Sequence, residues 1–542
     1  MDLPFIATTP FIVATMARRG LLTPGHPVRI VRQFGALGRW GFGLAGELRQ
    51  AAARSPHRVA VIDDERRVTY AELLAGAEHI ARALRDEGVG SRDRIGLLMR
   101  NSARMIETLI GITTLGADPV LINTGLSASQ LTAVAGDQDL RAVIHDDEFA
   151  PQLARLTIPR RDQRWPASVT GAGELRPASP TGAGGLRPAP VTGTDPLRPP
   201  ERPGRTIVLT SGTTGTPKGA RRPTPGGFRP LCSVIDRIPL RAGDHVLISA
   251  PLFHTWGFAG LQIALALRAT IHLHRRFQPE RVRDTITGGG VDALIAVPVM
   301  LQQLMDLPAQ AASPGLRVAA VSGSALPGGL ATRFMDRYGD VLYNLYGSTE
   351  ASWVSIATPA DLRAAPDTAG RPPAGTTVKI LDEQDSEVPP GTVGRIFVAN
   401  EMIFEGYTNS AATRKRDGLL GTGDLGHVDA AGRVFVDGRE DDMIVSGGEN
   451  VYPAEVEDLL AGLPQVREVA VIGVPDDEYG QRLAAYLVLR DDEKLDPDVV
   501  REHVRRNRAR FCVPRDVIFL DALPRNATGK ILARELPRPA AG

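Results

Sequence analysis

The sequence predicts an α/β and α+β protein with a large N-terminal region and a small C-terminal domain. Between residues 69 and 370, short apolar runs alternate with segments of helical spacing, which is typical of βαβ units. After residue 370 the runs become shorter and more alternating, which indicates a β-rich subdomain. The end of the chain returns to a compact mixture of strands and helices. We place the boundary between residues 1–441 and 442–542.

Length and composition exclude several classes of protein. The chain has 542 residues, which suggests three or four domains at about 150 residues each. Apolar residues make up 43% and charged residues 23%, so the chain is not wholly disordered. The net charge of +1 does not favour nucleic acid as the main partner. Two cysteines exclude a disulfide framework and a Cys-rich metal site, so a reducing compartment fits.

The first predicted helix covers residues 69–88. Thr69 and Glu72 have the spacing of a capping box, which satisfies exposed N–H groups at the start of a helix. One face of this helix is apolar and is expected to face the core, through Leu73, Leu74, Ala77, Ile80, Ala81 and Leu84. A buried strand at 94–99 and a second helix near 102–116 follow. This alternation predicts an α/β region.

Residues 165–205 interrupt the pattern. An 11-residue repeat rich in Gly, Pro and Ala begins at Thr170, again at Thr181 and, in degenerate form, at Thr192. It contains too few apolar anchors to build a core and has no common solenoid period. We interpret this segment as a flexible insert and assign it no chemistry.

Further strands and helices are expected on both sides of the domain boundary. The buried strands after the insert are predicted at 206–210, 245–250, 293–297 and 317–322. In the C-terminal part, a helix beginning at Pro453, strands at 466–474 and 483–489, and a helix from about residue 497 indicate a separate α+β domain.

The N-terminal segment is expected to pack on the body of the protein. It lacks a basic region ahead of its apolar stretch, so it is a poor signal peptide. Its apolar run is broken by Pro10 and is too short to span a bilayer. We therefore expect a cytoplasmic protein, with a weak peripheral membrane contact of this segment as the alternative.

The strongest local motif is TSGTTGTPKGA at residues 210–220, directly after a predicted strand. Backbone N–H groups and hydroxyls of such a loop can surround a polyphosphate, and Lys218 adds a positive charge. The motif is not the usual P-loop, because Gly219 stands where that motif has Ser or Thr. Only five of the 63 basic residues are lysine, so a lysine in this loop carries information. The alternative is a Gly- and Thr-rich turn.

Three other motifs are weak when taken singly. In NLYGSTE (344–350), Glu350 can bind Mg²⁺ and Tyr346 can stack on a base, although a surface turn fits equally well. In TGDLG (422–426) and GREDD (438–442), Asp424 and Arg439 can bind ribose hydroxyls, or the segments can be plain turns. Lys530 lies in PRNATGKIL (524–532), where a lone lysine is usually a solvated charge.

These motifs, with PLFHTWGF (251–258), together resemble the AMP-forming acyl-CoA synthetases of the adenylate-forming superfamily. They occur in the order of that family between about residues 206 and 532, and the helix at 69–88 resembles its opening element. The resemblance implies a large N-terminal adenylate-forming domain and a small mobile C-terminal domain, joined at a hinge that Asp442 matches. It also implies that a carboxylate attacks ATP to give an acyl-adenylate, after which the C-terminal domain rotates and CoA takes the acyl group.

The resemblance also assigns roles to individual residues. Phosphate contacts are expected from the 210–219 loop and the α-phosphate ligand, namely Thr210, Ser211, Gly212, Thr213, Thr214, Gly215, Lys218 and Thr349. The adenine and ribose sites are expected at Gly323, Ser324, Ala325, Tyr346, Gly347, Asp424 and Arg439. Glu350 would bind Mg²⁺, and Lys530 would bridge the substrate carboxylate and the α-phosphate. His254 and Trp256 match a segment that lines the acyl pocket, or they form a packed aromatic cluster.

Three functions follow from the motifs. The first is a ligase for a medium- or long-chain fatty acid that uses ATP, Mg²⁺ and CoA. The second is an acyl-AMP ligase that loads a separate carrier protein. The third is a catalytically silent nucleotide-binding scaffold, which the presence of Lys218, Glu350 and Lys530 disfavours. Acyl chain length, oligomeric state and pathway are not specified by the sequence.

Overall fold

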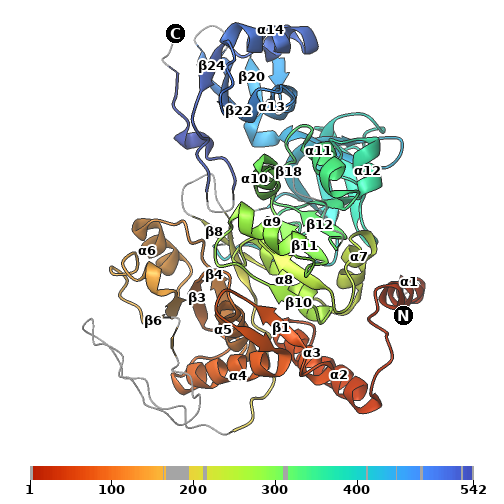
Figure 1. The fold of residues 1–542 in the computed structure, drawn as a ribbon, viewed down its shortest axis with the longest axis vertical. Coiled ribbons are helices and arrows are strands. Elements are labelled where there is room, and N and C mark those ends of the chain that lie inside the picture. The colour runs from red at the N-terminus through yellow and green to blue at the C-terminus, as the bar shows by residue number, and fades with distance from the viewer. Residues whose placement is uncertain are drawn as a thin grey trace.

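The computed structural model shows a large body with a smaller domain at one end (Figure 1). The N-terminal helices lie at the far side of the body, and the C-terminal strands and helices form the small domain at the top of the view (Figure 1). The structure describes residues 4–162, 164–165, 195–210, 217–308, 315–409, 413–446, 449–476, 480–526 and 529–539. The first two repeats of the 165–205 insert, the start of the third, and five of the predicted loop residues, Ser211, Gly212, Thr213, Thr214 and Gly215, lie outside the described residues.

Two mixed, largely parallel sheets form the body. The first has the strand order β6-β5-β3-β4-β7-β8, with bounds β3 Arg94–Leu98, β4 Asp118–Leu121, β5 Ala142–His145, β6 Arg160–Asp162, β7 Ile207–Thr210 and β8 Lys218–Arg221. The second has the order β14-β13-β12-β11-β9-β10-β1-β2, with bounds β1 Val59–Ile62, β2 Arg67–Thr69, β9 His245–Ile248, β10 Thr270–His272, β11 Ala293–Ala296, β12 Val318–Val321, β13 Leu342–Tyr346 and β14 Ser355–Ala357. Strands β9 to β13 pair in parallel. The prediction of an α/β body is confirmed.

A β-rich sheet and a separate C-terminal sheet complete the fold. The β-rich sheet contains β15 Thr377–Leu381, β16 Gly394–Ala399, β17 Lys415–Arg416, β18 Leu419–Val428 and β19 Val434–Arg439. The C-terminal sheet contains β20 Ile444–Ser446, β21 Glu449–Val451, β22 Val466–Asp476, β23 Gly480–Leu489 and β24 Asp516–Phe519. The short helix η2 (Glu440–Asp442) stands between the two sheets, and only Met443 separates Asp442 from the C-terminal sheet.

Fourteen α-helices cover these sheets in the described part of the chain. The bounds are α1 Pro4–Arg18, α2 Pro27–Trp40, α3 Leu44–Arg54, α4 Tyr70–Asp86, α5 Ala103–Thr114, α6 Ala128–Asp137, α7 Arg229–Arg237, α8 Thr255–Ala266, α9 Pro279–Thr287, α10 Pro298–Asp306, α11 Leu330–Tyr338, α12 Pro359–Ala364, α13 Pro453–Ala461 and α14 Pro497–Asn507. The predicted capping box starts α4: the Thr69 hydroxyl accepts the Glu72 N–H, and the Glu72 carboxylate accepts the Thr69 N–H.

The N-terminal segment is a series of helices that packs on the body. Arg18, at the end of α1, forms an ion pair with Asp236 of α7 at 2.7 Å, and Met16 belongs to the main core. Within the described residues, no helix combines the length and the apolar character needed to cross a membrane. The prediction that this segment packs on the body is confirmed, and the peripheral membrane contact stays a prediction.

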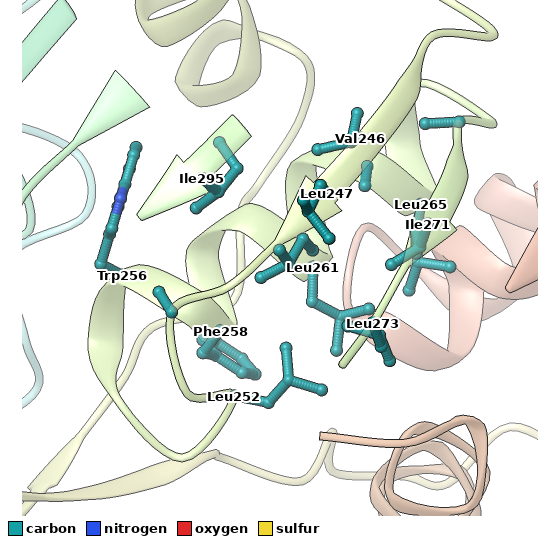
Figure 2. Close-up of a cluster of buried hydrophobic side chains, with 14 of the residues drawn as sticks. Val246, Leu247, Leu252, Trp256, Phe258, Leu261, Leu265, Ile271, Leu273 and Ile295 are labelled. Atoms are coloured by element: carbon teal, nitrogen blue, oxygen red, sulfur yellow. The ribbon is translucent and has the colours of Figure 1, made fainter. Parts of the chain in front are cut away.

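Helix α8 is tied to the second sheet by a dense apolar cluster. Figure 2 shows side chains of α8, such as Leu261 and Leu265, directed toward Val246 and Leu247 of β9 and toward the neighbouring strands. This packing fixes the direction of α8 across the sheet. The helix therefore carries its first residues to a defined place at the edge of the sheet.

Candidate active site

One cavity of about 710 Å³ lies where the parallel strands end. The carboxyl ends of β7, β9, β12 and β13 all lead into segments that line it. In open parallel sheets such ends are the usual place for a ligand, because the loops that follow them converge there. Eleven of the residues expected at the site line this cavity: Thr210, Lys218, His254, Trp256, Gly323, Gly347, Thr349, Glu350, Arg439, Asp442 and Lys530.

The hairpin of β7 and β8 brings Thr210 and Lys218 together on either side of the glycine-rich loop. The two residues are paired in register, and the Thr210 hydroxyl donates to the Lys218 carbonyl at 3.3 Å. The Lys218 ammonium lies 5.7 Å from the centre of the Tyr407 ring, a cation–π distance. The loop between them lies outside the described residues, but both of its ends line the cavity.

Glu350 presents its carboxylate to Tyr407, the residue whose ring Lys218 also faces. The Tyr407 hydroxyl donates to Glu350 Oε1 at 2.6 Å, and burial together with this carboxylate raises the Tyr407 pKa. The Ser348 hydroxyl accepts the N–H groups of Glu350 and Ala351 at 3.2 and 3.0 Å, which fixes the turn after β13. Glu350 is therefore held in one orientation at the cavity wall.

Arg222 is a site residue that the sequence analysis missed. Its side chain is buried, its Nη1 donates to the Thr349 carbonyl at 2.6 Å, and its Nε has no hydrogen-bond partner in the described part of the chain. Burial lowers its pKa to about 10, against the favourable charge of Glu350. The Thr349 hydroxyl lies 2.8 Å from that of Thr255 at the start of α8. An arginine thus fastens the Thr349–Glu350 turn to the first sheet.

His254 caps helix α8 at the opposite wall. Its ring nitrogen Nδ1 accepts the Trp256 N–H at 3.4 Å, and burial lowers the His254 pKa to about 4, so the imidazole is neutral at physiological pH. Gly323 has a φ of +109°, and a Cβ there would lie 3.2 Å from the His254 ring. Glycine therefore keeps this wall open. Ser324 and Ala325, the next two residues, are exposed and do not line the cavity.

The sequence left open whether Trp256 lines the acyl pocket or packs in an aromatic cluster, and in the structure it both lines the cavity and is packed in the core. It lines the cavity, yet it is 4% exposed and belongs to the main core. Its indole N–H donates to the Ala320 carbonyl at 3.3 Å, and Figure 2 shows its ring beside Ile295 of β11. The packed aromatic side chain is thus also part of the cavity wall.

Tyr346 and Asp424 form a polar pair beneath the cavity wall. The Tyr346 hydroxyl donates to Asp424 Oδ2 at 2.5 Å, and Arg439 Nη1 lies 3.4 Å from Asp424 Oδ1. Strands β18 and β19 place Asp424 directly opposite Arg439. Burial raises the Asp424 pKa, while the Tyr346 hydrogen bond and the Arg439 charge oppose that rise. Arg439 lines the cavity, whereas Tyr346 and Asp424 do not.

Lys530 reaches the cavity from the C-terminal domain. The Lys530 N–H donates to Asn526 Oδ1 at 2.9 Å, and both residues line the cavity. Burial raises the pKa of Asp424, and the charge of Lys530 is among the groups that oppose this rise. Gly529 has a φ of +83°, and a Cβ there would overlap Val299 of α10, so the loop lies against the body at this point. The structure therefore places Lys530 in the same cavity as Lys218 and Glu350.

The opposite branch of the cavity is mainly apolar. We define this apolar branch by the apolar lining residues of α7, α8 and the segments that precede α7 and α3, namely Phe42, Phe228, Pro230, Leu231, Val234, Ala259, Ile263 and Ala266. Sequence reasoning found only the start of α8, because the other side chains come from segments without a recognisable motif. Such a branch suits an apolar tail.

The charged branch suits a polyphosphate with one divalent ion. In the described part of the chain, no group of three or more His, Cys, Asp or Glu side chains forms a metal site. Glu350 supplies one carboxylate, which matches the way Mg²⁺ binds through one or two carboxylates and the phosphates themselves. Two lysines, Lys218 and Lys530, line the same cavity and can balance the negative charge.

Comparison with known proteins agrees with this geometry. The family model described as "AMP-binding enzyme" matches residues 48–408, and that of the "AMP-binding enzyme C-terminal domain" matches residues 455–530. The chain is 32% identical to indoleacetate–CoA ligase of Aromatoleum aromaticum, over 89% of this chain and 94% of that protein. It is 34% identical to feruloyl-CoA synthase of an Amycolatopsis species, over 90% and 97%. It is 30% identical to the long-chain-fatty-acid–CoA ligase FadD13 of Mycobacterium tuberculosis, over 90% and 96%.

Solved structures show the same similarity. The o-succinylbenzoate-CoA synthetase MenE of Bacillus subtilis, in complex with its acyl-adenylate intermediate, superposes with a TM-score of 0.77 at 27% identity, over 92% of this chain and 98% of that one. The amide bond synthetase McbA of Marinactinospora thermotolerans gives 0.78 at 27% identity, over 90% and 98%. From the motifs, the cavity and these matches together, the chain belongs to the AMP-binding enzyme family.

Proposed function

We propose that the protein activates a medium- or long-chain fatty acid with ATP and transfers the acyl group to CoA. As a member of its family it is an AMP-forming acid–thiol ligase, with ATP and Mg²⁺ as cofactors and CoA as co-substrate. The observation that supports the choice of acid is the shape of the cavity. The charged side chains of Lys218, Glu350 and Lys530 and the apolar side chains of α7 and α8 line one and the same cavity.

The reaction has two balanced halves. In the first, a carboxylate oxygen of the acid bonds to the α-phosphorus of ATP, and the bond to the β-phosphate oxygen breaks to release pyrophosphate. In the second, the thiol sulfur of CoA bonds to the acyl carbon, AMP leaves, and the thiol proton is released. Mg²⁺, when bound, neutralises phosphate charge in the first half.

The first half requires two anions to approach each other. In this proposal Thr349 contacts the α-phosphate, Glu350 holds the ion, and Lys530 bridges the α-phosphate and the incoming carboxylate. A cation fixed where negative charge accumulates stabilises the transition state more than the separate reactants. The loop from Thr210 to Lys218 holds the outer phosphates through its N–H groups.

The remaining roles concern the nucleoside and the hinge. Gly323, Tyr346 and Gly347 are assigned to the adenine site, with Asp424 and Arg439 at the ribose. Ser324 and Ala325 keep this role only as a proposal, since they lie outside the cavity lining. Asp442 is proposed as the hinge, which its position between the β-rich and C-terminal sheets supports.

The apolar branch supports the proposal of an apolar acyl tail, and an aromatic acid is the other candidate. The relatives carry names that include both aromatic acids and a long-chain fatty acid, so the choice of tail rests on the cavity. A second candidate is transfer to a carrier protein. A relative named fatty acid–[acyl-carrier-protein] ligase ScoC, from Streptomyces coeruleorubidus, is 31% identical over 90% of this chain and 94% of that protein.

The test is AMP release from ATP over a panel of acids from acetate to oleate and including aromatic acids, with and without CoA. Sustained turnover with fatty acids that depends on CoA supports the proposal. Turnover only with aromatic acids overturns the choice of tail. Adenylate formation without CoA-dependent turnover overturns CoA as the acceptor and favours the carrier protein.

A further inference from the structure

The apolar branch of the cavity contains two polar side chains. Glu47 of α3 and Gln262 of α8 both line it, among Phe42, Ile263 and other apolar groups. The half-buried side chain of Gln262 makes no hydrogen bond to any residue that the structure describes, although such an amide has four hydrogen-bonding positions. A wall meant only for a hydrocarbon would not need these groups.

Glu47 lies far from the reacting end, and Gln262 lies about 10 Å from it along the axis of α8. Helix α8 begins at Thr255, whose hydroxyl is 2.8 Å from that of Thr349. Its last residue, Ala266, also lines the cavity, and at 1.5 Å per residue this end is about 16 Å further along the helix axis. The Ala266 carbonyl accepts a hydrogen bond from Gln50 of α3, so α3 crosses α8 at this remote end.

The carboxyl group of Glu47 is buried and has few hydrogen-bond partners. It is 6% exposed, and its one hydrogen bond comes from Gln50 Nε2 at 3.2 Å. None of the ion pairs between described residues includes Glu47. Burial raises its pKa to about 8, and the more distant charge of Arg268 offsets only part of that rise. At neutral pH the side chain is therefore mainly a neutral carboxylic acid, which can donate one hydrogen bond and accept another.

A purely structural role for Glu47 is already filled by its neighbour. Gln50 Nε2 donates to the Leu265 and Ala266 carbonyls at 3.2 and 3.3 Å, and Gln50 Oε1 accepts from Gln33 at 2.8 Å. Gln50 thus joins α3 to α8 without help from Glu47. What distinguishes Glu47 is its place on the cavity wall.

We propose that Glu47, with Gln262, receives a hydroxyl group at the far end of the acid, so that the preferred substrates are acids with a remote hydroxyl. This inference rests on the proposed function and narrows its substrate class. A hydroxyl both donates and accepts, which matches a neutral carboxyl beside an amide. A terminal methyl offers no partner to the buried Glu47 carboxyl or to the half-buried Gln262 amide, and sites of this kind reject the analogue that lacks the partner.

The test compares matched pairs of acids that differ only in the remote hydroxyl. The pairs are 10-hydroxydecanoate with decanoate and 4-hydroxycinnamate with cinnamate, each assayed as kcat/KM for AMP release with CoA. The enzyme is used as the full chain and as the variants Glu47→Leu and Glu47→Gln. Gln33→Leu is the matched control, because it removes a buried amide of the same network that does not line the cavity.

For the wild type we expect at least one pair to favour the hydroxy acid by about 10-fold or more. Glu47→Leu should reverse that ratio, Glu47→Gln should keep most of it, and Gln33→Leu should change both acids of a pair equally. Equal kcat/KM within both pairs in the wild type, or an unchanged ratio in Glu47→Leu, overturns the inference. Silence with every acid is a different result, because it contradicts the proposed function itself. Thermal unfolding of each variant identifies any variant that fails to fold. If Glu47→Leu fails to fold, the inference is tested by the kcat/KM ratios of the wild type and of Glu47→Gln.

Discussion

Lys530 is the residue whose charge is expected to act mainly on the transition state. It lies exposed on a loop of the C-terminal domain, yet it lines the cavity that Lys218 and Glu350 share. For Lys530→Ala we expect pyrophosphate release to fall about 100-fold or more, with a much smaller change in the Kd for ATP. Stopped-flow pyrophosphate detection and calorimetry measure the two quantities.

The control for this variant is Lys379→Ala. Lys379 is another of the few lysines, and it pairs with Glu387 on the surface at 2.9 Å. Exposed pairs of this kind contribute about 1 kcal/mol or less, so both quantities should stay near those of the wild type. Unchanged pyrophosphate release in Lys530→Ala contradicts the assignment of Lys530.

Glu47 gives the folded protein a pH dependence with a definite sign. Burial raises its pKa from 4.5 to about 8, so between these values the folded state holds a proton that the unfolded state releases. The free energy of unfolding therefore falls as pH rises between the two pKa values. The decrease is about 1.4 kcal/mol per pH unit. Glu47→Gln lacks this effect.

We expect the unfolding temperature of Glu47→Gln to rise relative to that of the wild type as the buffer changes from about pH 5 to about pH 8. Other titrating groups are common to both proteins and cancel in the difference. Thermal unfolding followed by circular dichroism at several pH values measures it. A constant difference across the range would show that Glu47 is ionised in the folded state.

At the scale of secondary structure, features with local causes could be predicted from the sequence, whereas contacts between distant residues could not. The capping box of Thr69 and Glu72 and the buried strands were predictable because their causes lie within a few residues. Arg222 was not, because its partner Thr349 is 127 positions away. The hydrogen bond of Tyr407 to Glu350 and the position of Glu47 on the apolar branch could not be predicted for the same reason. Motifs identified the phosphate end of the site, whereas the acyl end depends on how separate helices meet.

The loop that carries Lys530 makes a close contact with helix α10. Gly529 has a φ of +83°, and a Cβ at this position would overlap Val299. For Gly529→Ala we expect pyrophosphate release to fall about 10-fold or more, because a left-handed alanine costs about 1–2 kcal/mol and the steric clash adds to it. Single-turnover assays of the adenylation half measure the effect.

Adding Val299→Ala to Gly529→Ala separates the two causes. The double variant removes the clash and keeps the backbone strain, so it should recover part of the lost rate. If the double variant is no faster than Gly529→Ala, the contact with α10 does not limit the approach of Lys530.

At the scale of the whole molecule, the same contact offers a way to hold the two domains together. The ideal Cβ position of residue 529 lies 3.5 Å from the Cβ of Val299, within the range of a disulfide. We expect the oxidised double variant Val299→Cys/Gly529→Cys to make one equivalent of adenylate and then stop before thioester formation. A reducing agent should restore CoA-dependent turnover.

The native cysteines do not interfere with this experiment, because Cys232 and Cys512 are both buried and unpaired. Each single cysteine variant, treated with the same oxidant, is the control for strain and for side reactions. Thioester formation at the wild-type rate in the fully oxidised double variant contradicts a reaction that needs the C-terminal domain to move.

One wall of the cavity is supplied by Lys530 and Asn526 from the C-terminal domain. An acyl-adenylate is a mixed anhydride, and water destroys it with the loss of an ATP. In the proposed mechanism the domain that helps to make this compound also shields it, and its departure would admit the acceptor and the solvent together. The rate of ATP hydrolysis in the absence of any thiol is therefore expected to report how often the C-terminal domain moves away from the cavity.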